Sequence, residues 1–169
     1  MATGKTVGEF RDFELTESAN AERLAITDLT QIKTQHNVLA FDDTTVEYVD
    51  FPIYIENYDG GGFQIDGTLT FASATGATNK CRMEFSIHTL DNGKIMDAAF
   101  THTFDGVTVA ADATNNNVKI DFTLNMTNID GLADGKDALV RVRRNTNHAD
   151  DNATGDVYLL YALCRVKEQ

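Results

Sequence analysis

The sequence predicts an all-β protein built as an antiparallel β-sandwich. Three observations predict it: apolar and polar residues alternate in several segments, turn-forming residues separate these segments, and no helical period intervenes between them. The chain has 169 residues, a length typical of one domain with a sizeable core. About seven or eight strands fit this spacing, which is compatible with either a jelly-roll or an immunoglobulin-like strand order.

The alternating segments define the expected strands and the side chains that face the core. Pro52 has the opposite phase within its segment, which is typical of an edge strand or a bulge. The residues that we expect to face inward are Val49, Phe51, Ile53, Ile55, Ile65, Leu69, Phe71, Cys81, Met83, Phe85, Ile87, Ala98, Phe100, Phe104, Val118, Ile120, Phe122, Leu124, Met126, Val140 and Val142. The segment 156–166 is apolar on both faces, so we expect a central strand covered on each side.

Turn chemistry separates the expected strands. Glycine, asparagine and aspartate gather in "NYDGGGF", "SATGATN", "LDNGK", "ATNNN" and "IDGLADGKD". The "GGG" at residues 60–62 is interpreted as a flexible turn, and the "DNG" at residues 91–93 as a hairpin turn.

Residues 1–45 differ from the rest of the chain because their apolar residues show no sustained period. We interpret them as an N-terminal arm or an added strand layer, and residues 46–169 as the sandwich domain. Within the arm, "ESANAERLA" favours a short helix capped by Ser18.

The charge balance excludes two classes of partner. Fourteen lysines and arginines stand against 26 aspartates and glutamates, a formal net charge of −12. Such a chain repels phosphate backbones and anionic membranes, so we expect no nucleic acid and no membrane as partner. No apolar run is long enough to span a bilayer, and the N-terminus lacks the apolar core of a signal peptide, so we expect synthesis in the cytoplasm. Cys81 and Cys164 lie in apolar segments and are expected to be buried free thiols.

The histidines provide a weak metal motif. Of His36, His88, His102 and His148, the middle two flank the "DNG" turn and would face each other across a hairpin, as zinc ligands sometimes do. No third ligand lies at a sequence spacing typical of a zinc motif, and both histidines lie on the polar face of their expected strands. We therefore expect solvated surface histidines.

No catalytic set emerges from the sequence. The "TGKT" of residues 3–6 has the ending of a phosphate-binding loop but lacks the earlier glycine and the preceding strand. Neither cysteine has a neighbouring histidine, and no serine has the context of a nucleophile elbow. We expect no enzyme activity and no cofactor.

The segment "RVRRNTNHADDNATGDVYLLY", residues 141–161, resembles a calcium loop. Its candidate ligands are Asp150, Asn152, Thr154 and Asp156, but an EF-hand would need a glutamate where Tyr161 stands, and the flanks are strands. We favour a turn between two core strands and assign no metal. Arg141 and Arg143 point outward and are expected to form ion pairs.

Two stretches resemble a known family. "FDDTTVEYVDFPIYIENYDGGGFQIDGTLTFASATGATNKCRMEFSI" and "MTNIDGLADGKDALVRVRRNTNHADDNATGDVYLLYALCRV" share their order of turns and strands with bacteriophage virion-associated proteins, whose jelly-roll domains assemble as trimers. The match spans about residues 41–166 and consists of turn and strand signatures, so it implies a fold and a virion role but no site residues.

The resemblance implies a non-enzymatic structural protein on the exterior of the virion. The expected role is that of a capsid decoration (cement) protein that forms a homotrimer and binds the major capsid protein or another virion protein. The alternative is a tail-associated module that binds a receptor or a glycan. The arm, which is polar with spaced apolar residues, is the segment that we expect to contact the virion.

Overall fold

A computed structural model describes residues 6–10, 18–19, 22–26, 36–91 and 102–168. These residues contain eleven β-strands and no helix, and none of them forms a helix that could cross a membrane. The strands are β1 (Thr6–Phe10), β2 (Ser18–Ala19), β3 (Glu22–Ile26), β4 (His36–Phe41), β5 (Tyr48–Tyr54), β6 (Tyr58–Phe71), β7 (Lys80–Leu90), β8 (Asp105–Ala110), β9 (Ile120–Met126), β10 (Asp137–Arg144) and β11 (Val157–Glu168).

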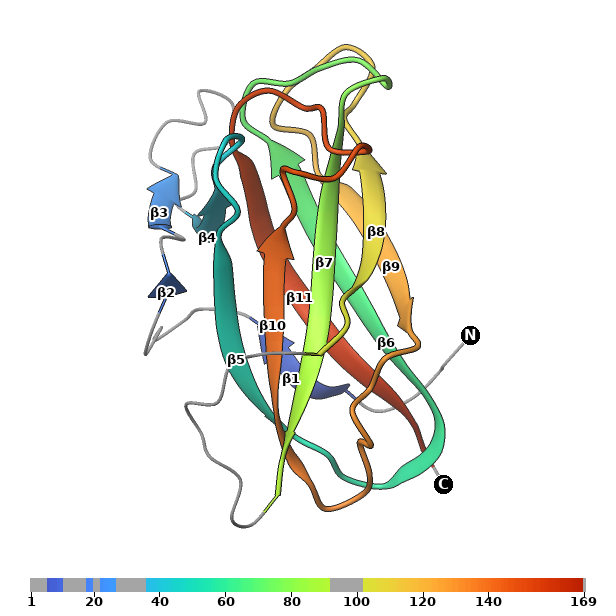
Figure 1. The fold of residues 1–169 in the computed structure, drawn as a ribbon. Helices are drawn as coiled ribbons and strands as arrows, with labels where there is room; N and C mark the ends of the chain where they lie inside the picture. The colour runs from blue at the N-terminus through green and yellow to red at the C-terminus, as the bar shows by residue number, and fades with distance from the viewer. Residues whose placement is uncertain (1–5, 11–17, 20–21, 27–35, 92–101, 169) are drawn as a thin grey trace.

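The strands form two antiparallel sheets packed face to face (Figure 1). The first sheet has the order β3-β4-β11-β6-β9, with β1 also paired to β11, and the second has the order β2-β5-β10-β7-β8. Strands β4 to β11 therefore make two four-stranded sheets, β4-β11-β6-β9 and β5-β10-β7-β8. This is the strand order of a jelly roll, and it decides between the two topologies that strand spacing left open.

Most of the side chains that alternation placed inward lie in the core between the sheets, but Val118 and Ile120 are only partly buried. Every residue predicted to face inward on β5, β6, β7 and β10 is buried, and Phe122, Leu124 and Met126 of β9 are buried as well. Ala98 and Phe100 lie outside the described residues. Phe104 is only partly buried, and it precedes β8 instead of belonging to a strand.

A glycine makes room for one of the core aromatic rings. Gly67 of β6 pairs with Phe122 of β9, and the Phe122 ring folds over it: a Cβ at Gly67 would lie 2.2 Å from the ring. The same ring approaches Phe85 of the opposite sheet, with 6.0 Å between centroids. Gly67 lies on the inward face of β6 but has no side chain, and the Phe122 ring of the neighbouring strand fills that space.

The sandwich begins earlier than residue 46. Strand β4 pairs with β11, and its Leu39 and Phe41 are buried in the core. Since β4 is the first of the eight jelly-roll strands, the sandwich starts at His36, and the expected boundary lies too late by about one strand. Six residues are too few to show a period, which is why the sequence did not separate this strand from the arm.

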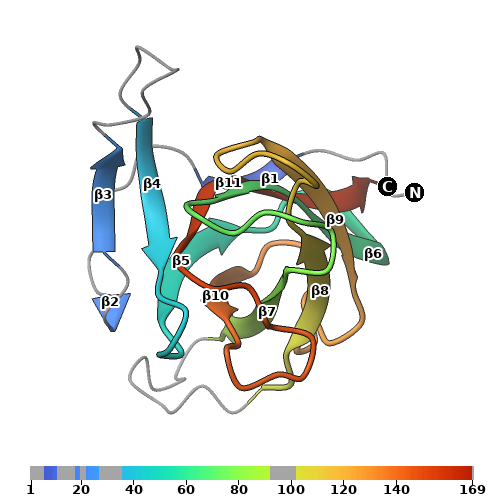
Figure 2. The ribbon, with the colours of Figure 1, turned by 90° about the horizontal axis from the view of Figure 1, so that it is seen from above.

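Further upstream, the expected helix at Ser18 is wrong. Residues 18–19 form β2, which pairs with β5, and residues 22–26 form β3, which pairs with β4. Figure 2 shows β3 and β2 one after the other on the side of the molecule where β4 lies, away from β8 and β9. Sheet pairing overrides the local helix signal here, as tertiary contacts often do. The expectation of an added strand layer describes this region better than that of a free arm.

Strand β11 is central, between β4 and β6, as expected. Its inward residues are fully buried, whereas the outward Tyr158, Leu160 and Leu163 are partly exposed. The expectation that both faces are covered is therefore wrong for the outward face. Pro52 lies near an edge, because the described part of β2 pairs with β5 only at Tyr48 and Val49.

Candidate functional site

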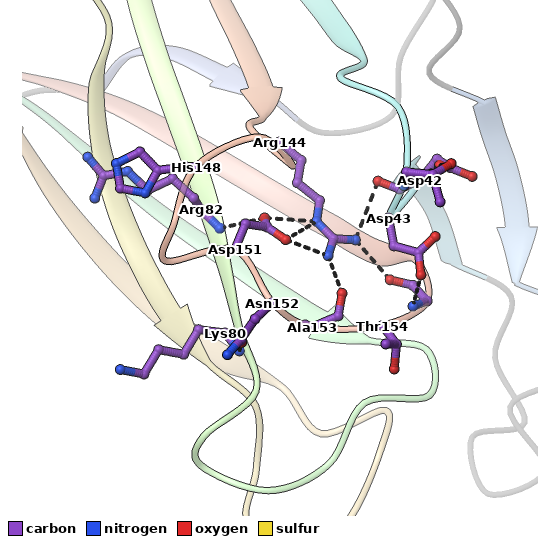
Figure 3. A network of polar contacts seen from close by, with 12 residues as sticks. Asp42, Asp43, Lys80, Arg82, Arg144, His148, Asp151, Asn152, Ala153 and Thr154 are labelled. Atoms are coloured by element: carbon purple, nitrogen blue, oxygen red, sulfur yellow. Dashed lines mark hydrogen bonds and ion pairs between the residues drawn. The ribbon is translucent and has the colours of Figure 1, made fainter.

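The loop after β10 is organised by one buried arginine (Figure 3). Arg144 ends β10 in the phase of Val140 and Val142, so its side chain points inward, and it is 0% exposed. Its partner Asp151 has a side chain that is only 2% exposed. A guanidinium is stable in a buried position only when its N–H groups form hydrogen bonds. Its acceptors therefore show which segments Arg144 holds together.

All the acceptors of Arg144 belong to the chain itself. Nε lies 3.0 Å and Nη2 2.8 Å from the two carboxylate oxygens of Asp151. Nη2 also donates to the carbonyl of Ala153 at 2.6 Å, and Nη1 donates to the carbonyls of Gly155 at 2.8 Å and Asp42 at 3.4 Å. The guanidinium therefore closes the loop onto itself and onto the end of β4.

The same loop is fastened to β7. The backbone N–H of Arg82 donates to Asp151 Oδ2 at 2.8 Å, and the N–H of Lys80 donates to Asn152 Oδ1 at 2.8 Å. The backbone N–H groups of Asn152 and Ala153 both donate to the carbonyl of Lys80 at 2.9 Å. We refer to Arg144, Asp151 and these fastenings as the loop clamp.

The four calcium-loop candidates do not converge. The Asp150 side chain is 57% exposed beside His148, whereas Asn152 is engaged with β7. Thr154 and Asp156 accept hydrogen bonds through their carbonyls, from Ser73 Oγ and from the N–H of Ala72. Ligands of a calcium loop occupy every second position, so the calcium hypothesis selected Asp150 and Asn152 and omitted Asp151. Asp151 is the carboxylate that organises the loop. The sequence signal that could have identified the clamp is Arg144 standing in the inward phase.

The outward arginines form ion pairs within the chain, as expected. Arg141 makes a bidentate pair with Asp50, with Nε and Nη2 each 2.7 Å from a carboxylate oxygen, and lies over the Tyr48 ring. Arg143 binds Glu84 at 2.7 Å and lies 3.7 Å above the Phe104 ring. That contact accounts for the position of Phe104 outside the core.

A second polar cluster lies on the outer face of the sheet that contains β7. His88 Nδ1 lies 2.7 Å from His102 Nε2, and the ring centroids are 4.9 Å apart. Asp130, from the connection between β9 and β10, places Oδ1 3.3 Å from His102 Nδ1 and Oδ2 3.8 Å from His88 Nδ1. We refer to these three residues as the His–His–Asp cluster.

The backbone of Thr89 holds the aspartate of this cluster in place. The Thr89 N–H donates to Asp130 Oδ2 at 2.8 Å, and Thr89 Oγ1 donates to the Asp130 carbonyl at 2.8 Å. Asp130 has φ +46°, a left-handed conformation that aspartate tolerates better than most residues. The carboxylate is therefore oriented toward the imidazoles by contacts that do not involve them.

The expectation of solvated surface histidines is wrong for His88, which is 8% exposed. The two histidines do meet, as the zinc hypothesis required, and Asp130 supplies the third ligating group that the sequence did not point to. Among the described residues, these three side chains are the one group of three or more histidine, cysteine, aspartate or glutamate side chains close enough to hold a metal ion.

Neither cysteine is disposed to act as a nucleophile. Both are buried free thiols, as predicted. Burial raises the pKa of Cys81 to about 12, and burial likewise raises the pKa of Cys164. A nucleophilic cysteine needs its thiolate, which neither residue forms near neutral pH.

Comparisons with known proteins add a likeness of fold. No protein-family model matches the sequence, and no characterised protein matches it. Among the solved structures that are similar are TmCBM61, a carbohydrate-binding module, in complex with β-1,4-galactotriose, and an exo-β-1,3-galactanase from Phanerochaete chrysosporium with galactose. Both have a TM-score of 0.45. The first is 10% identical and covers 88% of this chain and 86% of its own, and the second is 12% identical and covers 96% and 29%. At these values neither match bears on function.

Proposed function

We propose that the protein is a non-enzymatic bacteriophage virion protein that decorates the outer capsid surface as a homotrimer. The resemblance of residues 41–166 to virion-associated jelly-roll proteins motivates the proposal. The observation that carries it is the placement of β1, β2 and β3, three short strands outside the eight-stranded jelly roll: β2 and β3 pair with its edge strands β5 and β4, and β1 pairs with β11.

These N-terminal strands are suited to contacts between subunits. Strand β3 is outermost at one edge of the first sheet and β2 at one edge of the second, so one short stretch of chain borders both sheets. Pairing at a sheet edge depends on backbone hydrogen bonds, which a neighbouring subunit or capsid protein offers equally well. The jelly roll then serves as the exposed knob, and the N-terminal strands serve as its attachment.

Binding to capsids tests the proposal. The full chain should bind undecorated capsids of the phage that encodes it, measured by co-sedimentation and located in a density map. A variant lacking residues 1–34 keeps β4 and should fold but bind far more weakly. Failure of the full chain to bind overturns the proposal. Equal binding by the shortened variant shows that the N-terminal strands are not the attachment.

Assembly is tested separately by light scattering. Three chains would carry a net charge of three times −12, or −36, so self-repulsion opposes assembly at low ionic strength. We expect a trimer at moderate salt that weakens as salt is removed. A monomer at every salt and protein concentration contradicts the homotrimer.

A glycan-binding module is the second candidate, and one observation favours it. Tyr54, at the end of β5, is the single exposed large hydrophobic residue of the described chain, at 54% exposure. An exposed ring offers the combination of apolar face and polar edge that ligand recognition uses. Binding on a glycan array that Tyr54→Ala abolishes would favour this candidate over capsid decoration.

A further inference from the structure

We propose that the His–His–Asp cluster is a zinc site, in which His88, His102 and Asp130 bind one Zn²⁺ and cross-link three segments of the chain. The inference is independent of the proposed function, because it concerns side chains within one chain and no virion contact.

The donor set is suited to this metal. Two imidazole nitrogens and one carboxylate oxygen are typical zinc ligands, whereas calcium and magnesium prefer oxygen ligands throughout. One ligating atom from each of the three side chains lies within 4.8 Å of the others. Atoms that share one tetrahedral zinc at about 2.0–2.1 Å lie roughly 3.3–3.5 Å apart.

Two of the three separations between these atoms lie on either side of that value. His88 Nδ1 lies 2.7 Å from His102 Nε2 and 3.8 Å from Asp130 Oδ2. Zinc binding would therefore need the two rings to separate by less than about 1 Å, while the carboxylate approaches by a similar amount. His102 has more room to rotate than His88, since its side chain is 27% exposed and that of His88 is 11% exposed.

Part of the ligand shell is already oriented without metal. Thr89 holds the Asp130 carboxylate through a 2.8 Å hydrogen bond to Oδ2. Hydrogen bonds from second-layer groups to a ligating carboxylate are typical of zinc sites, because they fix the direction of its lone pairs. His88 projects from β7, where it stands opposite Leu139 of β10; the pairing of β7 with β8 ends at Phe85.

The three ligands come from separate segments. His88 lies on β7, His102 lies just before β8, and Asp130 lies in the turn between β9 and β10. The ion would therefore cross-link the segment before β8 and the turn between β9 and β10 to strand β7, as a disulfide cross-links segments in other proteins. Three protein ligands leave one coordination position for water, and the partial exposure of His102 and Asp130 gives an ion access from solvent.

Calorimetric titration of the metal-stripped full chain with Zn²⁺ tests the proposal. We expect one zinc per chain and a rise of several degrees in Tm. His102→Ala should abolish both effects, and Asp130→Asn should weaken binding by about tenfold or more, because it replaces an anionic ligand with a neutral one. Co²⁺ in the wild-type chain should show the intense visible absorption of a four-coordinate site.

His148→Ala is the matched control. His148 and Asp150 also form a histidine–aspartate pair, 3.7 Å apart, but among the described residues they belong to no group of three ligating side chains. This variant should bind zinc as the wild type does. Circular dichroism confirms that each variant is folded, and if His102→Ala is not folded, Asp130→Asn decides the question.

Two results would overturn the zinc site. One is the absence of saturable zinc binding by the wild-type chain. The other is undiminished binding by the folded His102→Ala or Asp130→Asn variants, in which case the cluster is a hydrogen-bonded structural contact and the zinc lies elsewhere.

Discussion

Two polar clusters lie at opposite ends of the same strand pair. In the register of β10 with β7, Arg144 stands opposite Met83, whereas Leu139 stands opposite His88. The loop clamp therefore closes one end of the pair, and the His–His–Asp cluster lies toward the other. Both bring together charged or titratable side chains that are far apart in the sequence.

The clusters differ in what surrounds their polar groups. Arg144 is in the inward phase, is fully enclosed, and donates to one carboxylate and three backbone carbonyls. The His–His–Asp cluster is on the outer face, and the side chains of His102 and Asp130 are 27% and 19% exposed. An enclosed cation with fixed backbone acceptors has no room for a ligand and stabilises the fold. In the His–His–Asp cluster, by contrast, His102 and Asp130 are reached by solvent, so the cluster is open to an ion in a way that the loop clamp is not.

The largest expected effect is at the clamp. Arg144→Leu should lower the free energy of unfolding by about 3–5 kcal/mol, because it leaves Asp151 charged, buried and unpaired. Urea denaturation measures the change. Adding Asp151→Leu should recover part of the loss. A cost below about 1 kcal/mol would mean that the clamp behaves as a surface ion pair.

Replacing the aspartate of each cluster by asparagine should distinguish the two clusters by the size of the loss in stability. Asp151→Asn should cost about 3 kcal/mol, since Arg144 stays charged in a buried site. Asp130→Asn in metal-free protein should cost about 1 kcal/mol or less, because asparagine still accepts the Thr89 hydrogen bond. Equal costs in urea denaturation would contradict the distinction between an enclosed and an accessible cluster.

Alkaline pH probes how tightly the clamp end is closed, because Cys81 lies within the electrostatic reach of Arg144 and Asp151. Burial raises the pKa of Cys81 from 9.0 to about 12 and also raises that of Cys164. Between these values the unfolded chain loses protons that the folded chain retains, so stability falls as pH rises above about 9. The slope approaches about 1.4 kcal/mol per pH unit for each thiol in this range.

Thermal unfolding between pH 8 and 11 measures this decline. The variant with both cysteines replaced by alanine serves as control and should show a shallower one. A thiol reagent at pH 8 should label neither cysteine in the native protein. Rapid labelling of native Cys81 would show that the clamp end opens freely.

The smallest effect is expected at the calcium-loop candidates. Replacing Asp150 and Asp156 together by asparagine should change stability by less than about 0.5 kcal/mol, because neither carboxylate forms part of the clamp. Tm should be the same in chelator and in excess calcium. If the wild type gains several degrees with calcium and the double variant does not, the loop is a metal site after all.

Much of the fold could be predicted because strand alternation is a local signal. Val49, Met83 and Leu124 each reveal their inward orientation through neighbours two residues away. The same logic placed Arg141 and Arg143 on the outer face, where they form ion pairs. It failed at β4, which is short, and at Ser18, where a helix-like sequence pairs with β5 instead.

The candidate site was less accessible to sequence reasoning. His88 and His102 were identified as a possible pair, but Asp130 lies 28 residues beyond His102 in a turn whose composition indicates only a loop. Arg144 carried a usable signal, since a charged residue in the inward phase requires an enclosed partner. The partner itself, Asp151, could not be told from Asp150 by composition or spacing.

The sequence by itself determined most of the residues that face the core, the burial of both cysteines as free thiols, and the all-β class. These depend on the side-chain period of a strand and on local hydrophobicity, which neighbouring residues reveal. Only the tertiary structure decided the jelly-roll strand order, the enclosure of Arg144 and the meeting of Asp130 with the two histidines. Those features depend on which distant segments become neighbours. The packing of the whole sandwich sets this, and no single segment contains the information that determines it.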